Sequence, residues 1–383
     1  MHFELDDEEE QLRASVARLL RDRAPFEQRG RLACSEQGWD PDLWPALAAL
    51  GVTALALPEA DGGFGRSPVA LLPTLRALGD ALAVQPFLAT AVLGATALVR
   101  AGSDAQRKRL LPGIADGSRI VAFAHAEAAA RHERQWIGAR ARRAQGRWLL
   151  DGCKHNVLFG AQAGAIVVSA RDAQDAIRLF LLDPAQPGVG CEATRLIDDT
   201  PAADLTLSTA PAELLPGDGA AALDAACDAG MAAVCAEALG VAERAHALTV
   251  EYVQARQQFG RAIGSNQAVR HRVADMRVAL EMLRSAAMAG LLALETPDND
   301  ERARELARAK MLAARHGTFV MRQAIQLHGG IGMTTEYAVG HCLRRMTVLD
   351  MLFGDGSHHA AWLGTALARG IVASDDGTRA AAP

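Results

Sequence analysis

The chain has 383 residues, half of them hydrophobic and only 4% aromatic, so its core must be built mainly from aliphatic side chains, a mixture that favours helices. Its 40 basic and 45 acidic side chains leave a formal net charge of −5, which excludes a large positive field for nucleic acid or an anionic membrane. Any anionic ligand must therefore be held by a few placed groups.

The cysteines and the N-terminus limit the type of protein further. The six cysteines form no CxxC pair and no His/Cys metal spacing, so neither a disulfide framework nor a metal site is predicted. The first residues are acidic where a signal peptide would be basic and then apolar, and we expect no apolar run of membrane-spanning length. The expectation is a cytoplasmic protein with no nucleic-acid or membrane partner.

In chain order, the sequence predicts helices, then strands, then helices, an α+β fold that is mainly α. Residues 1–118 show helical periodicity, with separate helices expected near 42–50, 69–82, 90–101 and 105–114. Residues 119–216 contain short apolar runs bounded by Gly, Asp, Gln and Pro, which are typical of a small β domain. The helical pattern returns over 217–372, and the small, polar residues 373–383 are expected to fray.

One long helix, predicted over 223–259, carries two charged residues of interest. At 100° per residue, Arg256 falls on the apolar face of this helix, where a bare cation requires an anion unless it emerges at the helix end. Gly260 is a plausible C-terminal cap. Glu237 lies at the border of the apolar stripe, as a solvated flank or facing a cleft, whereas Glu243 points the opposite way into water.

Two glycine-rich segments near the C-terminus are candidate ligand contacts. Residues 326–332, QLHGGIG, follow a helical run and let backbone N–H groups approach a phosphate closely, although turns alone also need glycine. Residues 352–359, LFGDGSHH, offer a carboxylate, a hydroxyl and two imidazoles. Three near-consecutive residues cannot form a Ser-His-Asp triad, so His358 and His359 are expected to begin the final helix.

The chain resembles the acyl-CoA dehydrogenase flavoprotein family in four segments taken together: 252–264 (YVQARQQFGRAIG), 274–276, 326–332 and 336–337. The order of domains and the 58–65 loop fit as well, so the resemblance spans nearly the whole chain. The chain is similar to the small-subunit type of pimeloyl-CoA dehydrogenase in the segments 122–127, 327–333 and 352–355. The resemblance implies a barrel-like middle domain and a C-terminal four-helix bundle.

The family implies FAD bound between subunits, oxidation of an acyl-CoA thioester to its trans-2-enoyl form, and electron delivery to an electron-transferring flavoprotein. By the same resemblance, the FAD contacts are assigned to matching positions: Arg256, Phe259, Gln267, Gln326, Gly329, Gly330, Phe123, Asp355 and Ser357. A diphosphate is the anion that an inward guanidinium at Arg256 needs.

The resemblance fails where the reaction needs a base within hydrogen-bond reach of the α-proton. Many family members carry a Glu at the position that is Phe353 here, and others carry it at the position of Gly230. Two substitutes remain as candidate bases: Glu237, two helical turns beyond Gly230, and Asp355, two residues after Phe353. Neither starts from the same backbone point as the lost glutamates.

The β domain departs from the family as well. The family's T-E-P-G-A-G-S-D segment reads Ala126–Arg131 here, and its flavin-shielding W-I-T segment reads Asn156–Leu158. Three hypotheses therefore stay open. The chain is a competent dehydrogenase in a homodimer or homotetramer, a base-lacking partner subunit in a heteromer, or a helical scaffold that has lost flavin. The acyl chain, with a dicarboxylyl chain such as pimeloyl suggested by the subtype, is left open too.

Overall fold

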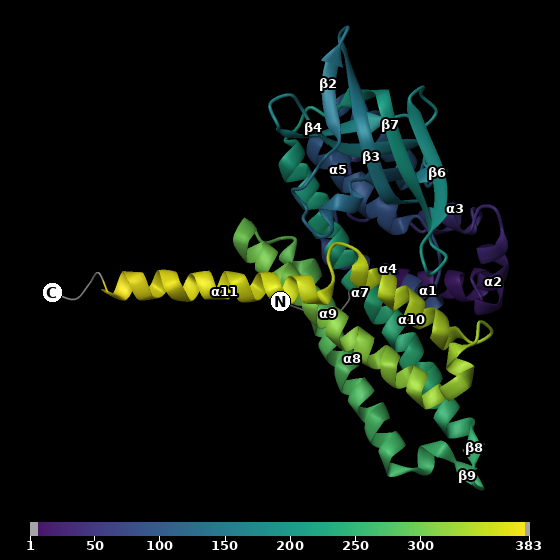
Figure 1. The fold of residues 1–383 in the computed structure, drawn as a ribbon. Coiled ribbons are helices and arrows are strands. Elements are labelled where there is room, and N and C mark those ends of the chain that lie inside the picture. The colour runs from purple at the N-terminus through teal and green to yellow at the C-terminus, as the bar shows by residue number, and fades with distance from the viewer. Residues whose placement is uncertain (1–6, 380–383) are drawn as a thin grey trace.

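The computed structural model describes residues 7–379 and the side chains of residues 10–368. It confirms the predicted order of helices, strands and helices (Figure 1). The N-terminal helices are α1 (Asp7–Arg23), α2 (Phe26–Cys34), α3 (Leu43–Ala48), α4 (Leu72–Ala81), the π-helix η3 (Phe87–Gly94), α5 (Ala95–Ala101) and α6 (Asp104–Ala115). Helix η3 is buried along its whole length, because its eight residues include no charged side chain.

The middle segment is a seven-stranded sheet that closes on itself. Its strands are β1 (Val121–Ala124), β2 (Arg140–Ala144), β3 (Arg147–Leu158), β4 (Ala165–Arg171), β5 (Ile177–Leu182), β6 (Val189–Arg195) and β7 (Pro201–Leu214). The order is β1-β4-β2-β3-β7-β5, and β5 also pairs with β4, which closes a small barrel. The short apolar runs of the sequence lie in β1, β3, β4 and β5, whereas exposed or charged residues in β2, β6 and β7 hide the apolar alternation.

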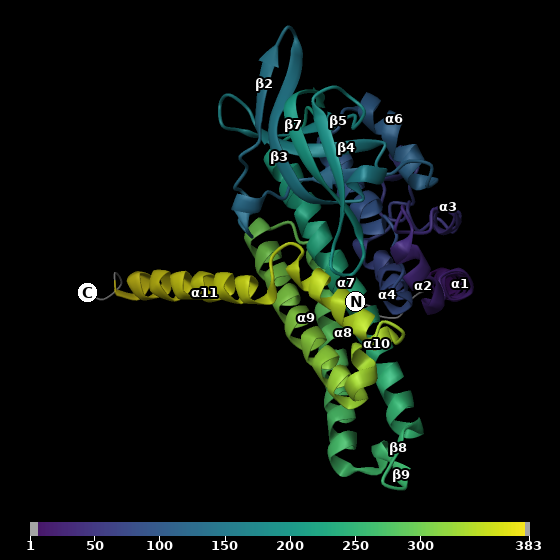
Figure 2. The ribbon, with the colours of Figure 1, turned by 45° about the vertical axis from the view of Figure 1, so that its right-hand side comes forward.

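The C-terminal helices form the bundle below the barrel in Figure 1. They are α7 (Gly219–Ala255), α8 (Gln267–Ala293), α9 (Asn299–His328), α10 (Ala338–Met351) and α11 (Gly356–Arg379), with the hairpin β8 (Gln257–Gln258) and β9 (Arg261–Ala262) after α7. Figures 1 and 2 show α11 projecting sideways from the bundle. The backbone stays helical to Arg379, beyond the fraying predicted from 373, and residues 380–383 lie outside the described residues.

Helix α7 is the central helix of the protein, and it corrects the expectation that no apolar run reaches membrane-spanning length. Within its 37 residues lies a stretch of mean hydropathy 1.4, so one apolar helix does reach membrane-spanning length. That stretch is 89% buried inside the protein, as expected for the central helix of a packed core. Asp218 starts the helix by accepting hydrogen bonds from the backbone N–H groups of Ala220 and Ala221.

Helices α4 and α7 pack unusually closely through two glycines. A Cβ added to Gly79 would overlap the carbonyl oxygen of Glu237, and one added to Gly240 would overlap the carbonyl oxygen of Arg76. The missing side chains let the two backbones touch. This contact fastens the N-terminal helices to the bundle.

Candidate functional site

The turn between α10 and α11 brings the predicted site to the junction of the three domains. Phe353 has φ 61° and Gly354 has φ 91°, and a left-handed backbone at a bulky residue such as Phe353 is a genuine outlier. Three hydrogen bonds hold the turn: His359 Nε2 donates to the Phe353 carbonyl at 2.9 Å, Gly356 N donates to Asp350 Oδ1 at 3.0 Å, and His358 N donates to Asp355 Oδ1 at 2.7 Å. As predicted, His358 and His359 lie at the start of the last helix.

The two positions that the family resemblance assigns to the catalytic base meet in space. A Cβ built on Gly230 would lie 2.8 Å from Cε2 of Phe353 and closer still to its Cζ, so the aromatic ring rests on the bare backbone of α7. The same Cβ would lie 2.8 Å from Cδ2 of Leu93, on η3. At this point the described chain presents a phenyl ring and a glycine, and neither accepts a proton.

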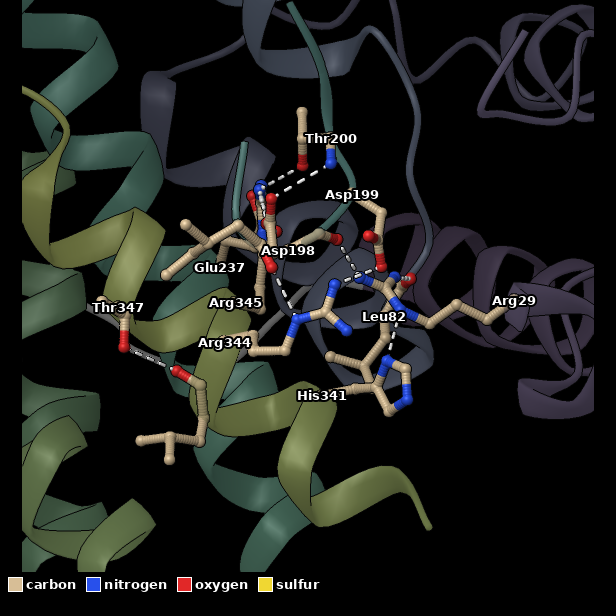
Figure 3. A network of polar contacts seen from close by, with 12 residues as sticks. Arg29, Leu82, Asp198, Asp199, Thr200, Glu237, His341, Arg344, Arg345 and Thr347 are labelled. Atoms are coloured by element: carbon tan, nitrogen blue, oxygen red, sulfur yellow. Dashed lines mark hydrogen bonds and ion pairs between the residues drawn. The ribbon is translucent and has the colours of Figure 1, made fainter. Parts of the chain in front are cut away.

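Glu237, the first candidate base, is engaged in a buried ion pair (Figure 3). Its Oε1 lies 2.6 Å from Nε of Arg345, whose Nη1 also contacts Asp198 Oδ2 at 2.8 Å. Burial alone would lower the pKa of Arg345, but the two carboxylates outweigh it and raise this pKa above its ordinary range. Glu237 is 6% exposed, so the predicted solvated flank is wrong.

Glu243 is also corrected by the tertiary structure. Its side chain is 16% exposed and contacts Arg76 of α4 and, at 2.7 Å, Arg284 of α8. The predicted solvent-facing side of α7 is therefore covered by two neighbouring helices. A helical wheel gives only the direction of a side chain and cannot show which helix lies there.

Asp355, the second candidate base, begins α11. Its Oδ1 accepts the backbone hydrogen bond from His358, and its Oδ2 lies 3.9 Å from Nε2 of His132. The backbone N–H of His358 is the main cause that lowers the pKa of Asp355, which makes the carboxylate a weaker base. Ser357, two residues further, lines a groove between α8 and α9.

Most of the residues assigned to FAD lie at the far end of the bundle, around the β8–β9 hairpin. Helix α7 ends at Ala255, four residues earlier than predicted, so Arg256 is an exposed C-cap and does not point inward. Phe259 (φ 52°) and Gly260 (φ 79°) form the two-residue loop of the β8–β9 hairpin, in the geometry of a type I′ turn. The phenyl ring of Phe259 is fully exposed.

The glycine cluster lies beside this hairpin end. His328 stacks on Tyr252 of α7 with ring centroids 4.5 Å apart, which places Gly329 and Gly330 next to the last turns of α7. Gln326, Gly329 and Gly330 are exposed, as is Gln267 at the start of α8. The only left-handed backbone of the cluster is at Gly329, with φ 62°. Six of the nine predicted FAD contacts therefore share one open end of the bundle.

Two charged features of the β domain were missed by the sequence prediction. Lys154 is fully buried, 2.6 Å from Glu127 Oε1, and burial lowers its pKa to about 8 despite that carboxylate. Burial, with Lys154 nearby, lowers the pKa of His125 to about 3. Arg134, in the loop before β2, contacts Asp228 of α7 at 2.9 Å and thereby ties this loop to the bundle. The sequence could not predict the Lys154–Glu127 pair, because a single Lys in a strand does not indicate which carboxylate lies beside it.

The side of the barrel where the flavin ring is expected is apolar. Phe123 and Leu158 are buried, with exposed fractions of 7% and 9%. Asn156, at the position of the family's tryptophan, has φ 53° and uses its backbone N–H to bond Asp204. The exposed guanidinium, amides and glycines at the hairpin end fit a phosphate-bearing ligand.

Comparison with known proteins agrees with this geometry. Residues 6–118 match the N-terminal domain and residues 217–367 the C-terminal domain of acyl-CoA dehydrogenase. The chain is 32% identical to the acyl-CoA dehydrogenase IpdE2 of Mycobacterium tuberculosis, over 86% of this chain and 88% of the relative. It therefore belongs to the acyl-CoA dehydrogenase family, FAD-dependent oxidoreductases that act on CH–CH groups.

Solved structures show the same fold. A variant of the Tcur3481–Tcur3483 steroid ACAD is 32% identical with a TM-score of 0.87, covering 96% of this chain and 99% of that one. The ChsE4–ChsE5 complex of Mycobacterium tuberculosis is 27% identical with a TM-score of 0.86, with the same coverage. The second structure is described as a complex of ChsE4 and ChsE5, and the name of the first joins Tcur3481 and Tcur3483.

Proposed function

We propose that this chain is the base-lacking subunit of a heteromeric FAD-dependent acyl-CoA dehydrogenase. The observation that carries the proposal is that Phe353 and Gly230, the two positions assigned to the base, meet in one contact and neither carries a carboxylate. The nearby carboxylates do not replace it, since Glu237 is held by Arg345 and Asp355 caps a helix. A partner chain must then supply the group that accepts the α-proton.

The distribution of the predicted FAD contacts supports a cofactor shared between chains. Asp355 and Ser357 follow the C-terminal end of α10, whereas Gly329 and Gly330 precede its N-terminal end. The 14 residues of α10 separate the two groups by about 20 Å at 1.5 Å per residue. We therefore assign the hairpin-end residues to a flavin that is seated mainly on the partner.

In this arrangement the chain binds and orients the cofactor, and the partner chain accepts the α-proton of the substrate. FAD, when bound, accepts the hydride that leaves the β-carbon. Arg256 would neutralise the diphosphate, Phe259 would cover an apolar part of the cofactor, and Gly329 and Gly330 would offer backbone N–H groups with no side chain in the way. The Arg256 guanidinium is available to a ligand, because within the described chain its side chain makes no hydrogen bond or ion pair.

We further propose a bulky or dicarboxylyl acyl-CoA as the substrate, electron-transferring flavoprotein as the electron acceptor, and the cytoplasm as the location. A steroid-derived acyl chain is supported by the description of the 32% identical Tcur3481–Tcur3483 structure, and a pimeloyl chain by the likeness of the 352–355 segment. A panel of acyl-CoA thioesters with both chain types separates the two.

Co-expression with a homologous chain that bears the glutamate tests the proposal. We expect a stable complex that is yellow and whose flavin absorption bleaches with an acyl-CoA, while the isolated chain turns over no substrate. Ordinary turnover by the isolated chain would refute the proposal in favour of a self-sufficient dehydrogenase. If neither the isolated chain nor any such complex contained flavin, the hypothesis of a helical scaffold that has lost flavin would be favoured.

Variants of the hairpin locate the shared cofactor. Arg256→Gln should lower the FAD content of the complex at least ten-fold, and Phe259→Asn, which tolerates the left-handed backbone, should lower it without unfolding the chain. Arg308→Gln, an exposed arginine on α9 some 20 residues before the glycine cluster, is the control and should keep FAD bound. Equal FAD content in all three variants would contradict the assignment.

A further inference from the structure

Two helices end beside the position assigned to the FAD diphosphate. Helix α7 ends at Ala255 and α9 at His328, and the stack of His328 on Tyr252 joins the two ends, with ring centroids 4.5 Å apart. The C-terminal end of a helix carries partial negative charge, so it repels an anion. A phosphate group at this place therefore needs compensating cations. Arg256 is one, and the histidine that ends α9 can become a second.

His328 is almost fully buried and carries one ring nitrogen without a partner. Its Nδ1 lies 2.8 Å from the carbonyl oxygen of Ala324. Because a carbonyl only accepts, Nδ1 must hold the proton of the neutral ring. Nε2 is then a buried lone pair with no hydrogen-bond partner in the part of the chain that the structure describes. A buried polar atom in this state is costly, and a proton on Nε2 would turn it into a donor.

Two tyrosine rings flank this imidazole. Tyr252 of α7 stacks on it at an interplanar angle of 27°, and the ring centroid of Tyr337 lies 5.0 Å away. The faces of aromatic rings attract cations, so both rings favour the protonated form. Glu251 and Arg244 of α7 are the charged groups that act on Tyr337, and their effects oppose each other. The segment that follows the histidine, η7 (Gly329–Met333), has no titratable side chain.

The charge of His328 depends on opposing influences. Burial is the largest and lowers its pKa below 6.5, whereas the carbonyls of Ala324 and Leu248 raise it. The imidazole is therefore neutral at pH 7 while no anion is bound. Gly329 and Gly330 come next in the chain, and a Cβ at either would meet no atom within 4 Å, so a phosphate group has open access to this helix end. Its negative charge would raise the pKa of the imidazole.

We propose that His328 takes up a proton when the diphosphate of FAD lies against Gly329 and Gly330, so that the cofactor binds at this end of the bundle more tightly as the pH falls. This proton uptake rests on the proposed function, because it needs a FAD shared at the hairpin end. The proton comes from solvent and binds Nε2, and the Leu248 carbonyl is an acceptor for the new N–H group. His328 touches no reacting atom and acts by placing positive charge at a helix end.

Calorimetric titration of FAD into the flavin-free complex with a glutamate-bearing homologue counts this proton. FAD suits the test because its diphosphate diester and its oxidised flavin keep the same charge between pH 6 and pH 8. From the heats in two non-phosphate buffers with different heats of ionisation, we expect uptake of about one proton per FAD at pH 7. The Kd should fall by roughly three-fold or more from pH 8 to pH 6 and level off below the pKa of the free imidazole.

Two histidine variants assign the proton. His328→Gln, whose amide can still donate to the Ala324 carbonyl, should bind FAD without proton uptake and with the same Kd at pH 6 and pH 8. His271→Gln, at an exposed histidine one turn after Gln267 on α8, is the control and should keep the wild-type behaviour.

Wild-type binding without proton uptake would overturn the inference, even if His328→Gln failed to fold. Unchanged uptake in folded His328→Gln would overturn it as well. Failure of the proposed function gives a different result. A complex that binds no FAD at all would contradict that function and this inference together, whereas FAD bound with a pH-independent affinity contradicts the inference alone.

Discussion

At Glu237, a carboxylate offered by the sequence as a base is held by a neighbouring guanidinium. Its Oε1 accepts from Arg345 at 2.6 Å in a site with little exposure, so its lone pairs face a permanent cation and not a substrate. Such a pair stabilises the fold only while both partners remain, because an unpaired buried charge is expensive. The residue is thus explained as part of the core.

We expect Glu237→Gln to lower the free energy of unfolding by about 2–4 kcal/mol, somewhat below the full loss for a broken buried pair because Arg345 keeps Asp198. Urea unfolding measures this change. Glu281→Gln, at a pair on the surface of α8 with both side chains about half exposed, should change stability by less than about 1 kcal/mol. If Glu237→Gln kept full stability but abolished turnover by the complex, Glu237 would be the base after all.

His359 makes the turn sensitive to acid. Burial is the main cause that lowers its pKa from 6.5 to about 4, so the folded chain holds a neutral imidazole that donates to Phe353. Between pH 6.5 and about 4 the unfolded chain binds the proton first, so stability is present above pH 6.5 and is lost as the pH falls.

For this one group the loss should reach about 3 kcal/mol below pH 4, at roughly 1.36 kcal/mol for each unit of pKa. Unfolding free energies measured from pH 7 to pH 4 should fall less steeply for His359→Gln, whose amide can donate the same hydrogen bond without titrating. Identical slopes for the two proteins would show that the buried imidazole does not drive the acid sensitivity.

At the scale of elements, glycines decide how closely helices approach. Gly79 and Gly240 let α4 and α7 touch backbone to backbone, while Gly364 on α11 has no other atom within 4 Å of where its Cβ would be. Alanine is intrinsically better than glycine in a helix by roughly 0.5–1 kcal/mol. The sign of a Gly→Ala change therefore reports whether the space beside the helix is filled.

We expect Gly240→Ala to destabilise the protein by about 2 kcal/mol or more, since the methyl group would collide with backbone that cannot move aside. Gly364→Ala should instead leave stability unchanged or raise it by up to about 1 kcal/mol. Thermal unfolding of both variants tests the pair. Equal effects would show that the α4–α7 contact is looser than described.

At the scale of the whole molecule, one polar network joins the three domains (Figure 3). Arg345 of α10 contacts Glu237 of α7 and Asp198 in the turn between β6 and β7. Arg29 of α2 donates to the Asp198 carbonyl at 2.6 Å and to His341 Nδ1 at 3.3 Å. Because its partners come from separate domains, the network fixes how these domains pack on one another.

Arg345→Met should cost about 3–5 kcal/mol of unfolding free energy, because it leaves two buried carboxylates without a cation. The triple variant Arg345→Met/Glu237→Leu/Asp198→Asn should regain at least half of that loss, since the two carboxylates are removed together with their cation. Chemical denaturation of both proteins provides the comparison. A triple variant as unstable as the single one would mean that the network is worth more than its charges.

The sequence by itself determined the order of the domains, the family, and the absence of a glutamate at positions 230 and 353, because these depend on periodicity and local motifs. Only the tertiary structure decided that Glu237 is paired, that Arg256 is exposed at a helix end, and that Phe353 lies on Gly230. The physical reason is that charge pairing and burial depend on neighbours from distant parts of the chain. Helical periodicity gives a side chain's direction, and packing alone supplies what it meets.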